Sequence, residues 1–247
     1  MSTKTKKNKQ EIIEATPTAI VEPTANLDVV FKPSNDLQLD RLNIRQPTSQ
    51  FAEPSDIGNL FVKKEFVITT AKQEAAVLVG AHKKGWAEQT DWDKHGPGRT
   101  VWTEEEAKVL IADVVRWNAE EKEPSDKPRK VIECCEFDLF FPFQEGNSCD
   151  DEAFEYDLDD NKWAGGILRT QNFGYKGMWH PVYKQTRGKR VGNDIASKLW
   201  TFKLTSGGSY FYPSLSARVK DGQTNASAEA MEWLDDWYKE SNWYNEV

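Results

Sequence analysis

The sequence has few of the side chains and motifs on which catalysis commonly depends. It holds three histidines and three cysteines in 247 residues. None of the histidines occurs in an H-E-x-x-H or C-x-x-C-H spacing, and the phosphate-binding motifs G-x-x-x-x-G-K-[ST] and G-x-G-x-x-G are absent. We therefore expect no enzyme activity, no catalytic residue, no metal site and no cofactor.

Cysteine is too scarce and too irregularly spaced to stabilise the fold by cross-links. Cys134, Cys135 and Cys149 are an odd set, and the first two are adjacent. This spacing suits neither a disulfide framework nor a C-x-x-C metal site, and it is typical of a reducing compartment. No apolar run reaches the length of about 18 residues that a membrane span needs. The prediction is a cytoplasmic protein, in the host cytoplasm if the chain is viral, with no membrane partner.

One pair of carboxylates keeps a catalytic alternative open. Glu136 and Asp138 alternate with Phe137 and Leu139, so in a strand the two acids would share a face. Scattered carboxylates of this kind can hold the metal ions of a nuclease. The interpretation that we favour places both acids on the solvent side of a half-buried strand, with Phe137 and Leu139 inward.

Acidic residues outnumber basic ones over the whole chain, but the basic residues are concentrated in one segment. The formal net charge is −8, yet residues 161–220 hold eleven Lys and Arg against one acid, Asp194. This segment therefore carries +10, and the remainder of the chain carries −18. The same segment contains ten aromatic side chains.

Cations interleaved with aromatic rings are typical of a surface that binds single-stranded nucleic acid. Cations contact phosphates, and rings stack on bases with about 1–3 kcal/mol per base. The alternative is a β-rich core segment with a solvated basic face, and we expect about half of the ten rings to be core. The predicted nucleic-acid-binding residues are Trp163, Arg169, Phe173, Tyr175, Lys176, Trp179, Tyr183, Lys184, Arg187, Lys189, Arg190, Trp200, Lys203, Tyr210 and Tyr212.

Alternating apolar residues predict a mainly β protein. Strands are expected over residues 60–70, 75–79, 131–143, 197–205 and 210–219, with residues 85–100 as a loop. Within residues 197–205, Trp200, Phe202 and Leu204 point to one side. The sequence S-G-G-S at residues 206–209 predicts a hairpin turn.

Two helices are expected beside these strands. The first spans residues 104–118 and begins with the capping box formed by Thr103 and Glu106. Its apolar face is predicted to consist of Ala107, Leu110, Ile111, Val114 and Val115. The second helix spans about residues 228–239.

Together these elements predict an α+β fold that is mainly β, with one or two helices. We expect an OB-like, partly open antiparallel barrel, a scaffold that exposes a binding face. The expected organisation is a disordered N-terminal tail (residues 1–35), a barrel domain (36–221) with the inserted helix 104–118, and an acidic aromatic C-terminal helix and tail (222–247).

This arrangement resembles the single-stranded DNA-binding proteins of bacteriophages, which combine a basic, aromatic-lined OB barrel with an acidic C-terminal segment. The matching pieces are the residues named above and the acidic run from Glu229 to Val247. The stretch at residues 42–49, L-N-I-R-Q-P-T-S, also resembles the start of some phage replication-region proteins. The resemblance implies that the tail recruits replication proteins, and the predicted partner-binding residues are Trp237, Trp243, Tyr244 and Glu246.

The sequence thus predicts a single-stranded DNA-binding protein that coats exposed strands during phage DNA replication or recombination. Self-association is a further expectation. Two alternatives stay open: a virion or assembly protein that uses the aromatic surface for subunit contacts, and a metal-dependent nuclease.

Overall fold

The computed structural model describes residues 39–48, 53–91, 96–121, 128–146, 148–158, 161–186, 198–217 and 226–240. The predicted N-terminal tail (residues 1–35) lies outside these ranges, as do residues 187–197 and 241–247. Within the described part of the chain, no helix has the length and hydrophobicity that crossing a membrane requires.

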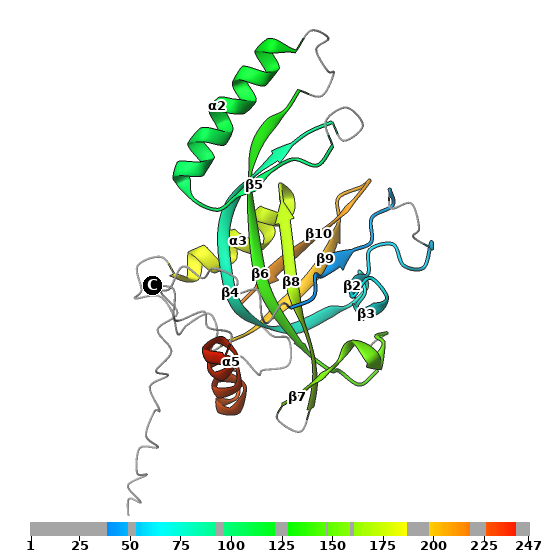
Figure 1. Ribbon diagram of the computed structural model, residues 1–247. Coiled ribbons are helices and arrows are strands. Elements are labelled where there is room, and N and C mark those ends of the chain that lie inside the picture. Colours follow the sequence, from blue (N-terminus) through cyan, green and yellow to red (C-terminus); the bar gives the residue numbers. More distant parts are fainter. Residues whose placement is uncertain are drawn as a thin grey trace, which may run out of the picture.

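A seven-stranded sheet forms the centre of the molecule (Figure 1). Its strand order is β10-β9-β4-β6-β8-β7, with β5 paired to one end of β4, and all these pairs are antiparallel. The strands are β4 (Glu74–Gln89), β5 (Thr100–Val101), β6 (Lys130–Pro142), β7 (Tyr156–Leu158), β8 (Asn161–Gln171), β9 (Leu199–Ser206) and β10 (Phe211–Ser216). The expected loop over residues 85–100 is wrong in part, because β4 continues through Gln89 and pairs with both β5 and β6.

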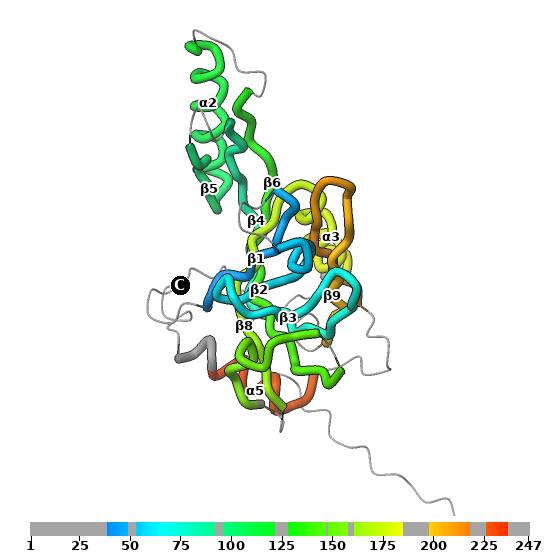
Figure 2. Tube along the Cα trace, turned by 90° about the vertical axis from the view of Figure 1, so that its right-hand side faces the viewer, coloured from blue at the N-terminus to red at the C-terminus, as the bar shows by residue number. Residues whose placement is uncertain are grey.

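A smaller sheet packs against one face of the main sheet (Figure 2). It consists of β1 (Asn43–Ile44), β2 (Leu60–Val62) and β3 (Phe66–Thr69), all antiparallel. The predicted single strand over residues 60–70 is therefore a hairpin, with Lys63 and Lys64 in its turn. Leu60, Val62 and Ile68 bury their side chains against the main sheet.

Strand β6 is buried on both faces, and this determines where the two hydrophobic cores lie. Cys135, Phe137, Leu139 and Phe141 face the core that is shared with the smaller sheet. Phe140 faces the opposite core, where α5 (Ala228–Glu240) covers the sheet through Ala230 and Leu234. Because side chains alternate along a strand, Glu136 and Asp138 lie on the same face as Phe140.

The prediction that Glu136 and Asp138 face solvent is wrong. Only 8% of the Glu136 surface and 5% of the Asp138 surface is exposed. The expectation treated β6 as a half-buried strand, but β6 is a central strand between β4 and β8.

The helix predicted over residues 104–118 is confirmed as α2 (Glu104–Glu120), which projects beside β5 and the ends of β4 and β6. Ala107, Leu110 and Val114 are buried as predicted. Ile111 and Val115 are not, because they are 47% and 65% exposed on the outer side of the helix. Only one narrow stripe of α2 packs on the strands.

A further helix, α3 (Phe173–Thr186), was not predicted. Its sequence contains two glycines and Pro181, which lower the helix propensity. Tertiary packing outweighs that cost. A Cβ atom at Gly177 would touch the carbonyl oxygen of Pro213 in β10, so glycine allows the helix and the strand to approach closely.

The predicted fold class is confirmed: the chain is α+β, mainly β, and its sheets are antiparallel and partly open. Over the described residues the strands do not close into a barrel, since β10 and β7 lie at opposite edges of the main sheet. The predicted inward set Trp200, Phe202 and Leu204 is buried in β9.

The capping box of α2 should contribute measurably to stability. The Thr103 side chain accepts a hydrogen bond from the Glu106 amide, and the Glu106 carboxylate accepts one from the Thr103 amide. We expect Thr103→Ala to lower the free energy of unfolding by about 1 kcal/mol, whereas Thr103→Ser should retain the cap. Urea denaturation of the two variants measures this, and equal losses in both would contradict a capping role.

Candidate functional site

Two adjoining pockets open beside the end of β8 and the segment that leads into β1. The first, the aromatic pocket, has a volume of about 750 Å³ and is lined by residues from β1, β8, α3 and the β9–β10 hairpin. The second, the cationic pocket, has a volume of about 640 Å³. Arg41, Asn43 and Arg169 line both pockets, so the two adjoin at these three side chains.

Three rings cluster at one end of the aromatic pocket. The Phe173 ring centroid lies 5.7 Å from that of Tyr212 and 6.1 Å from that of Tyr210, and the two tyrosine rings are 6.1 Å apart. Phe173 is 55% exposed, and both tyrosines are partly exposed. The Lys176 amine lies 5.9 Å from the Phe173 ring centroid. A group of neighbouring exposed rings is a candidate interaction surface, because contiguous exposed apolar patches often mark binding sites.

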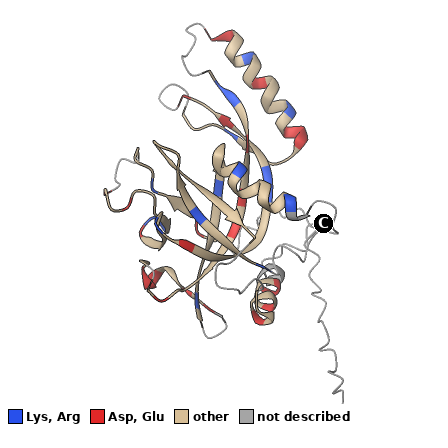
Figure 3. Ribbon diagram, turned by 180° about the vertical axis from the view of Figure 1, so that it is seen from behind, with Lys and Arg blue, Asp and Glu red and all other residues tan. Residues whose placement is uncertain are grey.

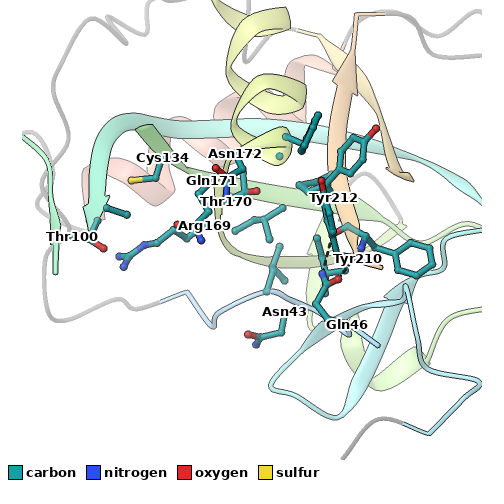
Figure 4. A pocket seen from close by; sticks show the side chains of 18 of the residues that line it. Asn43, Gln46, Thr100, Cys134, Arg169, Thr170, Gln171, Asn172, Tyr210 and Tyr212 are labelled. Carbon is teal, nitrogen blue, oxygen red and sulfur yellow. Dashed lines mark hydrogen bonds between the residues drawn. The ribbon is translucent and has the colours of Figure 1, made fainter. Parts of the chain in front are cut away.

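Gln46 fixes the aromatic hairpin against β1. Its amide group donates to the carbonyl oxygen of Phe211 at 2.9 Å and accepts from the Phe211 amide at 2.7 Å. These two bonds join segments that are 165 residues apart in the sequence. They hold Tyr210 and Tyr212, the neighbours of Phe211, at the rim of the pocket (Figure 4).

Polar side chains form another wall of the aromatic pocket. Arg169, Thr170, Gln171 and Asn172 follow one another at the end of β8 and line the pocket (Figure 4). Asn172 has a φ of 54°, in the left-handed region that favours glycine. This wall offers hydrogen-bond donors and acceptors opposite the rings.

Three side chains that pair across adjacent strands form the floor of the cationic pocket. Lys83 pairs with Glu136 across β4 and β6, and Glu136 pairs with Arg169 across β6 and β8. The Lys83 amine lies 2.8 Å from one Glu136 oxygen, and the Arg169 guanidinium donates to the other at 2.7 and 2.9 Å. One carboxylate thus aligns two cations on one face of the sheet.

Trp102 covers this Lys83–Glu136–Arg169 row. The Lys83 amine lies 4.3 Å and the Arg169 guanidinium 5.0 Å from the centre of the indole ring, both within cation–π range. A Cβ atom at Gly85 would touch the indole, so the ring lies directly on the β4 backbone. Trp102 itself is partly exposed at the pocket.

Glu136 is held in its charged form. Burial raises the pKa of its carboxyl group, but the hydrogen bonds and charges of Lys83 and Arg169 outweigh burial, and the pKa lies below its ordinary value. A carboxylate with both oxygens occupied is poorly placed to abstract a proton. Over the described residues, no group of three or more His, Cys, Asp or Glu side chains could hold a metal ion.

The remaining cations of the cationic pocket come from two exposed segments. Arg41 lies in the segment before β1, and Lys63 and Lys64 form the β2–β3 turn. Lys63 pairs with Asp40 and Glu155. Within the described part of the chain, Arg41 and Lys64 have no acidic partner.

Cys134 lines the aromatic pocket but lacks the properties of a nucleophile. Its side chain is 1% exposed, and burial raises the pKa of its thiol to about 11. At neutral pH the thiol stays protonated, and only the thiolate is reactive.

The structure brings together only part of the predicted site. Arg169, Phe173, Tyr210 and Tyr212 line the aromatic pocket, with Lys176 beside it. Tyr183 and Lys184 are exposed on α3 but line neither pocket, and Lys203 pairs with Glu74 on the sheet.

Several predicted ring contacts are corrected. Trp163, Tyr175 and Trp200 are 5%, 5% and 0% exposed and belong to the hydrophobic cores. Trp179 is partly buried, and its ring packs on that of Phe137 at 6.3 Å. Trp163, Tyr175 and Trp200 are thus core residues, whereas Trp179 packs against the core and keeps part of its surface exposed.

Other predicted residues lie outside the described part of the chain. They are Arg187, Lys189 and Arg190 of the basic loop, and Trp243, Tyr244 and Glu246 of the tail. Trp237 lies within α5. Figure 3 shows acidic residues on α5 and η1 (Asp151–Ala153), whereas the strands of the main sheet carry both basic and acidic residues.

Five pocket residues were missed because they precede the basic segment in the sequence. They are Arg41, Lys63, Lys64, Lys83 and Trp102. Two adjacent lysines interrupt the apolar alternation of residues 60–70, and that interruption is a signal of a hairpin turn. Nothing in the local sequence indicates that Lys83, Trp102 and Arg169 meet.

Comparison of the chain with protein-family models, with curated proteins and with solved structures gives no match.

Buried rings should contribute more to the free energy of unfolding than exposed rings, so stability measurements should distinguish the two groups. We expect Trp200→Ala to lower the free energy of unfolding by about 3–5 kcal/mol, because it leaves a cavity in the core. Phe173→Ala removes an exposed ring and should cost less than about 1 kcal/mol. Chemical denaturation compares the two variants, and a similar loss in both would contradict this division.

Proposed function

We propose that the protein binds single-stranded DNA through the aromatic and cationic pockets and catalyses no reaction. The observation that carries the proposal is the convergence of exposed rings and cations in adjoining pockets. Phe173, Tyr210 and Tyr212 supply the rings, and Arg41 and Arg169 line the boundary to the cationic pocket. These side chains come from three separate parts of the chain: residue 41, residues 169–173 and residues 210–212.

The geometry favours unpaired bases over a duplex. Partly exposed rings that are 5.7–6.1 Å apart offer faces and edges on which unstacked bases can pack. In a duplex the base faces are already stacked on one another. The polar wall at residues 169–172 can contact base edges or the sugar–phosphate backbone without selecting one sequence.

The overall acidity of the chain does not oppose this function, because a ligand responds to the local field. The cationic pocket is lined by five cations and two acids. The resemblance to phage proteins predicts two further properties. The protein would coat strands in the cytoplasm during phage replication or recombination, and its C-terminal tail would recruit replication proteins.

Oligonucleotide binding separates the proposed function from its alternatives. We expect a fluorescent thirty-nucleotide single strand to bind, duplex competitor to displace it poorly, and affinity to fall steeply with salt as phosphate contacts are screened. An assembly protein need not bind the oligonucleotide at all, and a nuclease would cleave it when Mg²⁺ is added. Either of those outcomes would contradict the proposal.

A ring substitution locates the binding surface. Tyr212→Ala should weaken binding of the single strand about tenfold, in keeping with the loss of one stacked base. Tyr183→Ala is the matched control, because Tyr183 is 53% exposed but lines neither pocket. Fluorescence anisotropy measures both affinities. Unchanged affinity in Tyr212→Ala, or an equal loss in the control, would move the site elsewhere.

A further inference from the structure

The cationic pocket contains a strained turn. Lys63 and Lys64 have φ angles of 53° and 65°, the left-handed conformation that glycine and asparagine adopt most easily. The two lysines are the central residues of a β-turn closed by the Glu65 amide, which donates to the Val62 carbonyl at 3.2 Å. Where both central residues of a turn need a positive φ, the usual residues are Asn-Gly or Asp-Gly. Both positions instead hold lysine, at a cost in stability.

Among the described residues, every non-glycine residue with a positive φ lines one of the two pockets. There, Lys63, Lys64 and Asn172 are the non-glycine residues with positive φ. The two lysines line the cationic pocket, and Asn172 lines the aromatic pocket. Unfavourable backbone conformations persist where a side chain is needed at that place, and they cluster at functional sites.

The charges of the pocket divide into two groups. Lys83 and Arg169 form ion pairs with Glu136, and Lys63 forms ion pairs with Asp40 and Glu155. Arg41 and Lys64 are exposed, line the same pocket and have no acidic partner in the described part of the chain. The paired cations still contribute to the local field, because the pocket is lined by five cations and only two acids and is therefore positively charged overall.

We propose that the cationic pocket is a phosphate-binding site, in which Arg41 and Lys64 contact the phosphate directly. Lys83 and Arg169 add positive charge from the floor. This inference rests on the proposed function and deepens it: the pocket would hold a phosphate of the strand whose bases stack in the aromatic pocket. Arg41 and Asn43, which line both pockets, lie on the path between the two.

Two substitutions of Lys64 separate the effect of its charge from the effect of its backbone strain. Lys64→Gln and Lys64→Gly both remove the charge, so each should weaken single-strand binding several-fold and lower the slope of log affinity against log salt by about 0.7. Lys64→Gly also relieves the strained φ and should raise the melting temperature by about 2–4 °C, whereas Lys64→Gln should not. The Lys64 carbonyl, which accepts from the Arg45 guanidinium at 2.7 Å, is kept in both variants.

Arg41→Gln tests the second contact and Lys108→Gln is the charge-matched control. Lys108 is exposed on α2 and lines neither pocket. We expect Arg41→Gln to lower the salt slope by the same amount as Lys64→Gln, and Lys108→Gln to leave affinity and slope at the wild-type values. Oligonucleotides with and without a 5′-phosphate show whether the bound phosphate is internal or terminal. If the variants lose the same affinity for both oligonucleotides, the phosphate is internal. If they lose affinity only for the phosphorylated one, the phosphate is terminal.

The outcomes also separate this inference from the proposed function. If wild-type protein binds the strand and Tyr212→Ala weakens binding, but Arg41→Gln and Lys64→Gln bind with the wild-type affinity and slope, the phosphate site is wrong while the function stands. If wild-type protein does not bind the strand, the proposed function is wrong and this inference falls with it.

Discussion

The charge of Glu136 at the centre of the main sheet is the constraint from which the cationic pocket follows. A carboxylate that is 8% exposed would be strongly destabilising without partners, and removal of one partner would leave a buried charge uncompensated. The antiparallel register of β4, β6 and β8 places Lys83 and Arg169 on either side of it. Two cations are thereby held on one face of the sheet, and Trp102 packs over them. The cationic pocket is thus a consequence of strand pairing.

The aromatic pocket depends on a different constraint, the attachment of the β9–β10 hairpin to its neighbours. Gln46 bonds the Phe211 backbone in two places, and Gly177 allows α3 to lie close against Pro213. As a result Phe173 on α3 and the two tyrosines of the hairpin present their rings at one rim. The cores are completed by other rings, such as Trp200 and Phe202. The rings at the rim lie outside both hydrophobic cores, and the proposed function assigns them to a ligand.

Local patterns in the sequence predicted those elements whose signals are themselves local. Alternation identified β9, and the capping box identified the start of α2. Helix α3 was missed because glycine and proline disfavour a helix that only tertiary packing stabilises. The exposure of Ile111 could not be foreseen, since periodicity shows that a face is apolar but not how much of it is covered. The pocket was predicted only in part, because Lys83, Trp102 and Arg169 meet through strand register and not through spacing.

Photo-crosslinking of a single strand that carries 4-thiothymidine would show where bases contact the protein. After ultraviolet irradiation and digestion, mass spectrometry identifies the cross-linked peptides. Stacking of bases in the aromatic pocket predicts adducts on the peptides that contain Phe173, Tyr210 and Tyr212. Adducts confined to the outer face of α2 or to the end of α3 that carries Tyr183, or no adducts above those of a non-binding control protein, would contradict it.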